Sequence, residues 1–168
     1  MTKRSFRLLQ NAIAFSTLVV IFFAFYLEYG LGFQPCPLCL MQRACAFAFL
    51  FLCLVGLFLG SLARAKHVVV SQMVFTALGL FFASRQLWLE SIATPESAAC
   101  LPGIEMLIRY FPWRDLVHLF LWGSNSCGEV AWRAYGLSMA AWSAFYFGAM
   151  FLVSGIIFCR LLFTPIQR

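Results

Sequence analysis

Residues 33–60 read FQPCPLCLMQRACAFAFLFLCLVGLFLG. Two cysteines, Cys36 and Cys39, stand two residues apart between prolines, and an apolar run follows from 39 to 60 with Arg43 as its one charge. A run of about 20 apolar residues crosses a bilayer as a helix, because each residue adds about 1.5 Å to a path of about 30 Å. The stretch therefore predicts a transmembrane helix with a CxxC pair at its mouth.

Three further segments of the chain are long and apolar enough to span a membrane. They cover residues 8–27, 68–89 and 139–158. Of the 168 residues, 63% are hydrophobic and 11% are charged, against about 25% charged residues in a soluble domain. Segment 8–27 is too long for the apolar part of a signal peptide, and no small-residue cleavage site follows it, so we expect it to be retained. The predicted fold class is an all-α membrane protein: residues 1–168 form a single integral membrane domain, a four-transmembrane-helix bundle.

The distribution of Lys and Arg predicts the orientation of the bundle. Basic residues precede the first span, fill the connection between the second and third, and follow the fourth: Lys3, Arg4, Arg7, Arg64, Lys66, Arg160 and Arg168. Four spans place all of these on one side, and the positive-inside rule makes that side the cytoplasm. The net charge of +6 is thereby explained by topology and indicates no nucleic acid partner.

The long outer loop, residues 90–138, contains a segment with helical apolar spacing. Ile104, Leu107, Ile108 and Phe111 share one face, Pro112 interrupts the pattern, and Leu116 resumes it. We expect a short, broken amphipathic segment that lies on the outer leaflet; packing of the loop on the bundle is the alternative.

Seven cysteines are sorted by this topology. Three fall within or at the ends of spans and are expected to be small buried apolar side chains: Cys45, Cys53 and Cys159. The other four, Cys36, Cys39, Cys100 and Cys127, lie at or beyond the outer surface, which in a bacterial inner membrane faces an oxidising compartment. Four cysteines allow three pairings. Ring size and shared loops favour Cys36–Cys39 and Cys100–Cys127.

The CxxC pair has the local chemistry of a redox centre. A four-residue ring restricts the unfolded chain little, so a purely stabilising role is weak. Pro37 suits the first position of a helix, which puts Cys39 in the first turn, where N–H groups and the helix dipole favour a thiolate. Arg43 follows one turn later on the same face. A charged side chain within a span is a functional candidate, and an arginine that extends to the lipid headgroups is the alternative.

Cys100–Cys127 closes a longer loop, so a structural staple worth about 3 kcal/mol is a serious alternative there. Two disulfides at one membrane face favour an electron relay instead.

The motifs "PCPLCLMQR" (35–43), "AAC" (98–100) and "GSNSCGEVAWRAYGLSMAAW" (123–142) resemble those of the disulfide bond formation protein B (DsbB) family of bacterial inner membranes. The resemblance covers nearly the whole chain. It implies a thiol:quinone oxidoreductase that reoxidises a periplasmic DsbA-like thiol oxidase and passes the electrons to a membrane quinone, ubiquinone or menaquinone.

The resemblance also implies roles for individual residues. Cys36 and Cys39 match the quinone-proximal pair, and Cys100 and Cys127 match the pair that meets the partner. Arg43 matches the arginine beside the quinone. The end of the third span, "SRQLWLE" (84–90), is similar to the other wall of the quinone site, where Arg85 and Trp88 are the expected contacts.

Two other readings are compatible with the residues. The four outer cysteines are the ligand set of a zinc site in a structural or metal-binding membrane protein, although the chain has no second CxxC and the compartment is oxidising; we expect no metal. A quinone-linked oxidoreductase with a different dedicated partner, including one similar to vitamin K epoxide reductase, uses the same chemistry.

Overall fold

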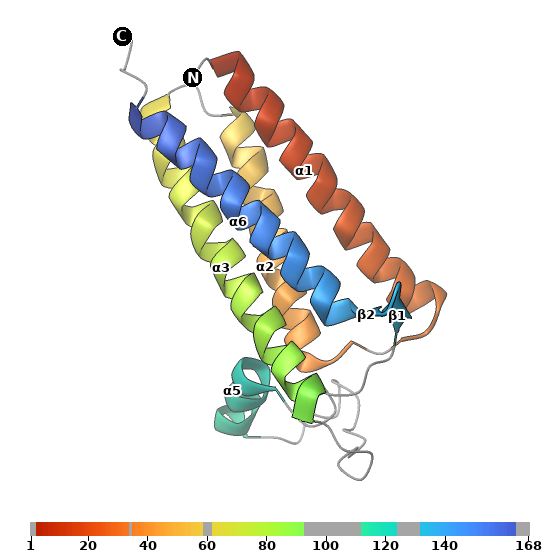
Figure 1. Ribbon diagram of the computed structural model, residues 1–168. Helices are drawn as coiled ribbons and strands as arrows, with labels where there is room; N and C mark the ends of the chain where they lie inside the picture. The colour runs from red at the N-terminus through yellow and green to blue at the C-terminus, as the bar shows by residue number, and fades with distance from the viewer. Residues whose placement is uncertain (1–2, 34, 59–61, 93–111, 124–131, 164–168) are drawn as a thin grey trace.

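The computed structural model describes residues 3–33, 35–58, 62–92, 112–123 and 132–163. Four long helices run side by side: α1 (Lys3–Phe25), α2 (Pro37–Phe58), α3 (Leu62–Ile92) and α6 (Met139–Phe163) (Figure 1). Each is long and apolar enough to cross a membrane. The predicted class, an all-α protein with four membrane-spanning helices, is confirmed.

The surface of the bundle is apolar, as a lipid solvent requires. Large side chains are exposed on every long helix, among them Phe15, Phe51, Phe81 and Phe145. Soluble monomers rarely expose large contiguous apolar patches. Polar side chains are buried instead, including Gln10, Gln72 and Thr76, each with 0% exposure.

The helices pack in a defined order. α3 contacts both α2 and α6, and α1 contacts α2. The start of α1 and the end of α6 lie at one end of the bundle (Figure 1). One apolar cluster at that end includes Phe6, Phe49 and Ile157. A second cluster, toward the opposite end, includes Leu38, Leu89 and Phe147. This opposite end carries the CxxC pair, and we call it the outer end.

Short elements complete the outer end. α1 continues into a π-helical turn, η1 (Tyr26–Gly30). Helix α5 (Trp113–Trp122) lies beside the ends of α2 and α3 (Figure 1). Strands β1 (Arg133–Ala134) and β2 (Leu137–Ser138) form a hairpin that leads into α6. Its two turn residues, Tyr135 and Gly136, both have positive φ, as a type I′ turn requires.

The predicted amphipathic segment is described only in its second half. α5 begins directly after Pro112, so the predicted interruption there coincides with a helix start. Trp113, Val117 and Leu121 are exposed on it. Residues 93–111, which include the first half, lie outside the described residues.

Candidate redox site at the outer end

The N-terminus of α2 positions the CxxC pair. Pro37 is the first helical residue, in agreement with its fixed φ and missing N–H. Cys36 occupies the capping position: its carbonyl accepts from the Leu40 N–H at 3.1 Å, and its Sγ accepts from the Cys39 N–H at 3.3 Å. A side chain that accepts from the third helical N–H is the usual N-cap arrangement. The sequence predicted that N–H groups of the first turn stabilise a thiolate at Cys39. In the structure the Cys39 N–H donates to Cys36 Sγ instead.

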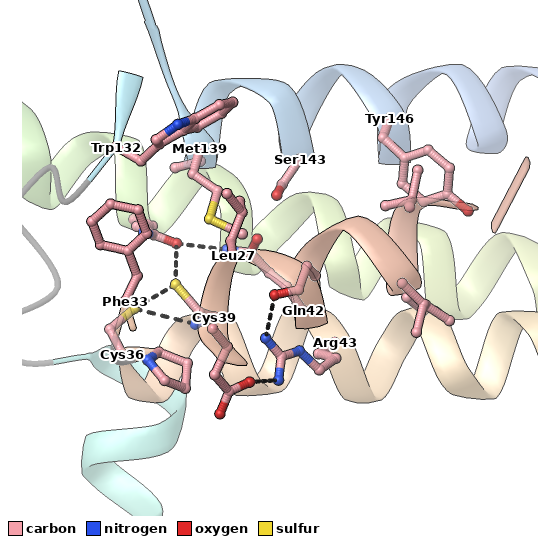
Figure 2. A pocket seen from close by; sticks show the side chains of 18 of the residues that line it. Leu27, Phe33, Cys36, Cys39, Gln42, Arg43, Trp132, Met139, Ser143 and Tyr146 are labelled. Carbon is pink, nitrogen blue, oxygen red and sulfur yellow. Dashed lines mark hydrogen bonds and ion pairs between the residues drawn. The ribbon is translucent and has the colours of Figure 1, made fainter. Parts of the chain in front are cut away.

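The two sulfur atoms are neighbours. Cys36 Sγ and Cys39 Sγ lie 2.8 Å apart, and Figure 2 shows both at the edge of a cavity. Cys39 Sγ also donates to Gln86 Oε1 of α3, at 3.5 Å. The same oxygen accepts from Gln42 Nε2 at 2.8 Å. Gln42 and Gln86 thus connect α2 to α3 beside Cys39 Sγ.

Arg43 lies one turn beyond Cys39 and lines the same cavity. Its Nη1 donates to the Glu28 carboxylate, and its Nη2 donates to the Ala24 carbonyl at 3.4 Å. Its guanidinium carbon lies 4.5 Å from the centroid of the Phe25 ring. All three partners belong to the end of α1 and the π-helical turn after it.

The cavity has a volume of about 180 Å³. A cavity of about 150 Å³ admits benzene, so this one has room for a single six-membered ring. Its polar lining comes from η1, α2, α3 and α6: Glu28, Cys36, Cys39, Gln42, Arg43, Gln86, Glu90, Ser143 and Tyr146. Its apolar lining comprises Val20, Ile21, Ala24, Leu27, Phe33, Pro35, Ala46, Trp132, Met139, Ala140 and Phe147. Toward the bundle interior, Tyr146 Oη donates to Thr17 Oγ1 at 2.8 Å.

Comparison with known proteins identifies the family. The family model described as "Disulfide bond formation protein DsbB" matches residues 6–157. The chain belongs to the DsbB family. The "Disulfide bond formation protein B" of Stutzerimonas stutzeri is 35% identical over 136 residues, which cover 80% of this chain and 83% of that protein. The protein of the same name from Hahella chejuensis is 37% identical over 126 residues, 72% of this chain and 74% of that one. "Disulfide bond formation protein B 1" of Pseudomonas aeruginosa is 32% identical over 138 residues, 82% and 85% respectively.

Within this DsbB-family fold, the residues predicted from sequence are only partly brought together. Cys36, Cys39 and Arg43 line one cavity. Cys100 and Cys127 lie outside the described residues. Cys45 and Cys53 are buried, as expected. Cys159 is exposed, so its predicted burial is wrong; it lies on the lipid-facing side of α6, where a weakly polar thiol is tolerated.

Arg85 is turned toward α5 and also lies over the ring of Trp88. The Arg85 guanidinium carbon lies 4.2 Å from the Trp88 ring centroid, and Arg85 Nε donates to the Trp122 carbonyl at 3.2 Å. Neither residue lines the cavity as the described residues form it. Their neighbour Gln86 does, because one step along a helix turns the side chain by about 100°.

Sequence reasoning missed Glu28, Gln86 and Glu90 as members of this DsbB-family site. A signal for Glu28 was present: it is the only acidic residue among the first 89, and it stands at the end of a span, where a charge is a functional candidate. Gln86 and Glu90 carried no such signal.

Proposed function

We propose that this DsbB-family membrane protein is a thiol:quinone oxidoreductase that generates disulfides. It reoxidises a periplasmic DsbA-like thioredoxin-fold oxidase and passes two electrons to a membrane quinone, ubiquinone or menaquinone. It resides in the bacterial inner membrane with both termini cytoplasmic and the redox loops periplasmic. The observation that carries the proposal is the CxxC pair opening onto a one-ring cavity lined by an arginine and two glutamines (Figure 2).

The residues around the cavity fit a quinone headgroup. Arg43 and Gln42 have N–H donors suited to carbonyl oxygens, and Ile21, Ala46 and Phe147 supply apolar wall. A quinone bound there supplies a two-electron, two-proton acceptor for the Cys36–Cys39 dithiol. The role of Arg85 and Trp88 toward that ring stays a prediction; the geometry favours Gln86 as the contribution of α3.

Thiol–disulfide exchange supplies the dithiol. A reduced cysteine of the partner attacks Cys100, and Cys127 leaves as a thiolate. Cys127 then attacks Cys36, and Cys39 leaves as a thiolate one turn from Arg43. The second cysteine of the partner resolves its bond to Cys100. Cys100 in turn attacks Cys127, which restores Cys100–Cys127 and releases Cys36.

The local geometry assists the two sulfurs of the CxxC pair. The Cys39 N–H and the helix N-terminus stabilise negative charge on Cys36. Arg43 lines the same cavity as Cys39, which supports a role for its guanidinium in stabilising the leaving Cys39 thiolate, because attraction in an apolar surrounding is less screened than in water. Cys36 is thus favoured as the sulfur exchanged with Cys127, and Cys39 as the sulfur nearer the acceptor.

The test uses the purified full-length protein, a reduced DsbA-like protein and ubiquinone or menaquinone in turn. One equivalent of quinone, measured from its absorbance, should be reduced for each disulfide formed in the partner. Cys39→Ser should abolish the change. Oxidation of the partner without quinone loss overturns the proposed acceptor, and quinone loss only with a different dithiol protein overturns the proposed partner.

The orientation has its own test. A membrane-impermeant thiol reagent applied to intact cells after reduction should label Cys100 and Cys127 and leave Cys159 unlabelled. Labelling of Cys159 contradicts the cytoplasmic C-terminus.

A further inference from the structure

A single segment of the chain encloses the Arg43 guanidinium. The Ala24 carbonyl, the Phe25 ring and the Glu28 carboxylate all contact it, and all three lie within five consecutive residues. We call residues 24–28 the arginine seat. Arg43, labelled in Figure 2, and its ion-pair partner Glu28 both line the cavity.

The π-helical turn gives the seat its shape. A π turn widens the helix by one residue and is frequent at functional sites. η1 starts at Tyr26, so Glu28 lies in its middle. Leu27, only 1% exposed, anchors the turn in the protein interior. The carboxylate is thereby held against α2, fifteen residues further along the sequence.

The ion pair is largely removed from solvent. The Arg43 side chain is 12% exposed and that of Glu28 is 21% exposed. Their charges therefore interact more strongly than a surface pair, and a guanidinium already paired has less attraction left for a second anion. That second anion is the thiolate formed at Cys39, one helical turn away.

We propose that Glu28 is a positioning residue that holds the Arg43 guanidinium in the arginine seat and balances its charge against the Cys39 thiolate. The inference rests on the proposed function, in which Cys36 and Cys39 cycle between disulfide and dithiol. Without Glu28, the full positive charge of Arg43 would stabilise the Cys39 thiolate, so the reduced Cys36–Cys39 dithiol would be a weaker electron donor. With Glu28 paired to Arg43, the thiolate is stabilised less, and the dithiol gives up its electrons more readily.

Other titratable groups face the same cavity and set its background field. Glu90 enters from α3 and Tyr146 from α6. Glu90 has the same carboxyl group as Glu28, on a different wall of the cavity. It is therefore the matched control for the loss of one carboxylate near the CxxC pair.

The first measurement is a redox equilibrium without quinone or partner. The full-length protein in detergent is equilibrated with glutathione buffers, and the reduced fraction of Cys36 and Cys39 is read from trapped, peptide-resolved thiols. Each disulfide reduced consumes two glutathione molecules and releases one glutathione disulfide. Glu28→Gln should shift this equilibrium about tenfold toward the dithiol, equal to about 30 mV for a two-electron couple. Glu90→Gln should shift it less than about threefold.

The second measurement is the alkylation rate of Cys39 at pH 7 in the reduced protein. Only the thiolate reacts, so Glu28→Gln should raise this rate several-fold. Glu28→Asp, which keeps the charge but withdraws it by one methylene, should give a smaller rise and secures the test should Glu28→Gln fold poorly. Unchanged equilibrium and rate in the folded variants overturn the proposal.

A double variant separates positioning from a simple field effect. When Arg43→Gln is already present, there is no guanidinium to release, and Glu28→Gln should change the equilibrium by less than about twofold. An equal shift in both backgrounds shows that Glu28 acts directly on the sulfur and overturns its role through Arg43. Since no arm uses quinone or partner, a wild-type protein that fails to reduce quinone refutes the proposed function alone.

Discussion

The bundle contains two polar regions that share residue types and differ in what surrounds them. Near the end of the bundle where α1 begins, Gln10 and Gln72 exchange two hydrogen bonds, at 3.3 and 2.9 Å, and Gln72 also donates to Cys53 Sγ at 3.3 Å. At the outer end, Gln42 and Gln86 meet beside Cys39 Sγ. Glutamine and cysteine thus occur together twice in one apolar protein.

The difference lies in charge and space. Gln10, Gln72 and Cys53 are completely buried, and none of the three lines the cavity at the outer end. The outer group opens onto a cavity and includes an ion pair. In both regions the glutamines form hydrogen bonds to other protein groups, as polar side chains in a membrane interior must. The same residue types therefore join helices at one end and are placed to do chemistry at the other.

The largest difference is expected between the two cysteines. Cys39→Ala should lower the rate of quinone reduction by more than about a thousandfold, because it removes a sulfur that forms and breaks a bond. Cys53→Ala should leave the rate within about twofold and cost about 1 kcal/mol of stability through lost packing. Steady-state kinetics and unfolding in mixed micelles measure both. A comparable loss of turnover in Cys53→Ala would show that the inner region also takes part in the reaction.

Arg43 comes next in expected effect. Arg43→Ala should slow quinone reduction roughly ten- to hundredfold and weaken apparent quinone affinity, since a charge at the edge of the apolar core is poorly screened. Arg43→Lys should fall between, because an ammonium keeps the charge and loses the planar fork. Rates over a quinone concentration series provide the test. If Arg43→Lys has the wild-type rate and affinity, and Arg43→Ala lowers only the stability of the protein, Arg43 anchors α2 at the lipid headgroups.

The Gln10–Gln72 pair should affect stability and not chemistry. Gln72→Leu leaves the Gln10 amide unpaired in the apolar interior, which should cost about 1–2 kcal/mol of unfolding free energy. Gln10→Leu together with Gln72→Leu should recover part of that loss, since no orphaned amide remains. Turnover should stay within about twofold in both variants. A large fall in turnover at full stability would assign this inner region a part in the reaction.

The smallest effect tests the cavity itself. A Cβ at Gly79 would overlap with Phe147 Cε1, and Phe147 lines the cavity. Gly79→Ala must therefore displace that ring, and we expect quinone affinity to weaken about three- to tenfold. Gly148→Ala is the matched control, because no atom from the described part of the chain lies within 4 Å of its Cβ position. Equal affinities in the two variants would place the quinone elsewhere.

Much of the fold followed from local sequence. Four apolar runs and the positions of the basic residues predict four spans, because membrane thickness sets the length of a helix. Pro37 marks the start of α2 because its lack of an N–H matters only inside a helix. Arg43 was predicted as a site residue from its charge within a span, its position four residues after Cys39 and the family resemblance, and it lines the cavity.

Tertiary structure alone decided which side chains from other helices complete the site. Glu28 reaches Arg43 only because the π-helical turn holds it against α2. On α3 the family resemblance implied Arg85 and Trp88, whereas the packed bundle turns Gln86 into the cavity and Arg85 toward α5. The physical reason is that α3 is apolar on nearly every face, so no periodic pattern separates the side that meets the cavity from the sides that meet lipid or α5. Only the rotation of the helix within the bundle makes that choice.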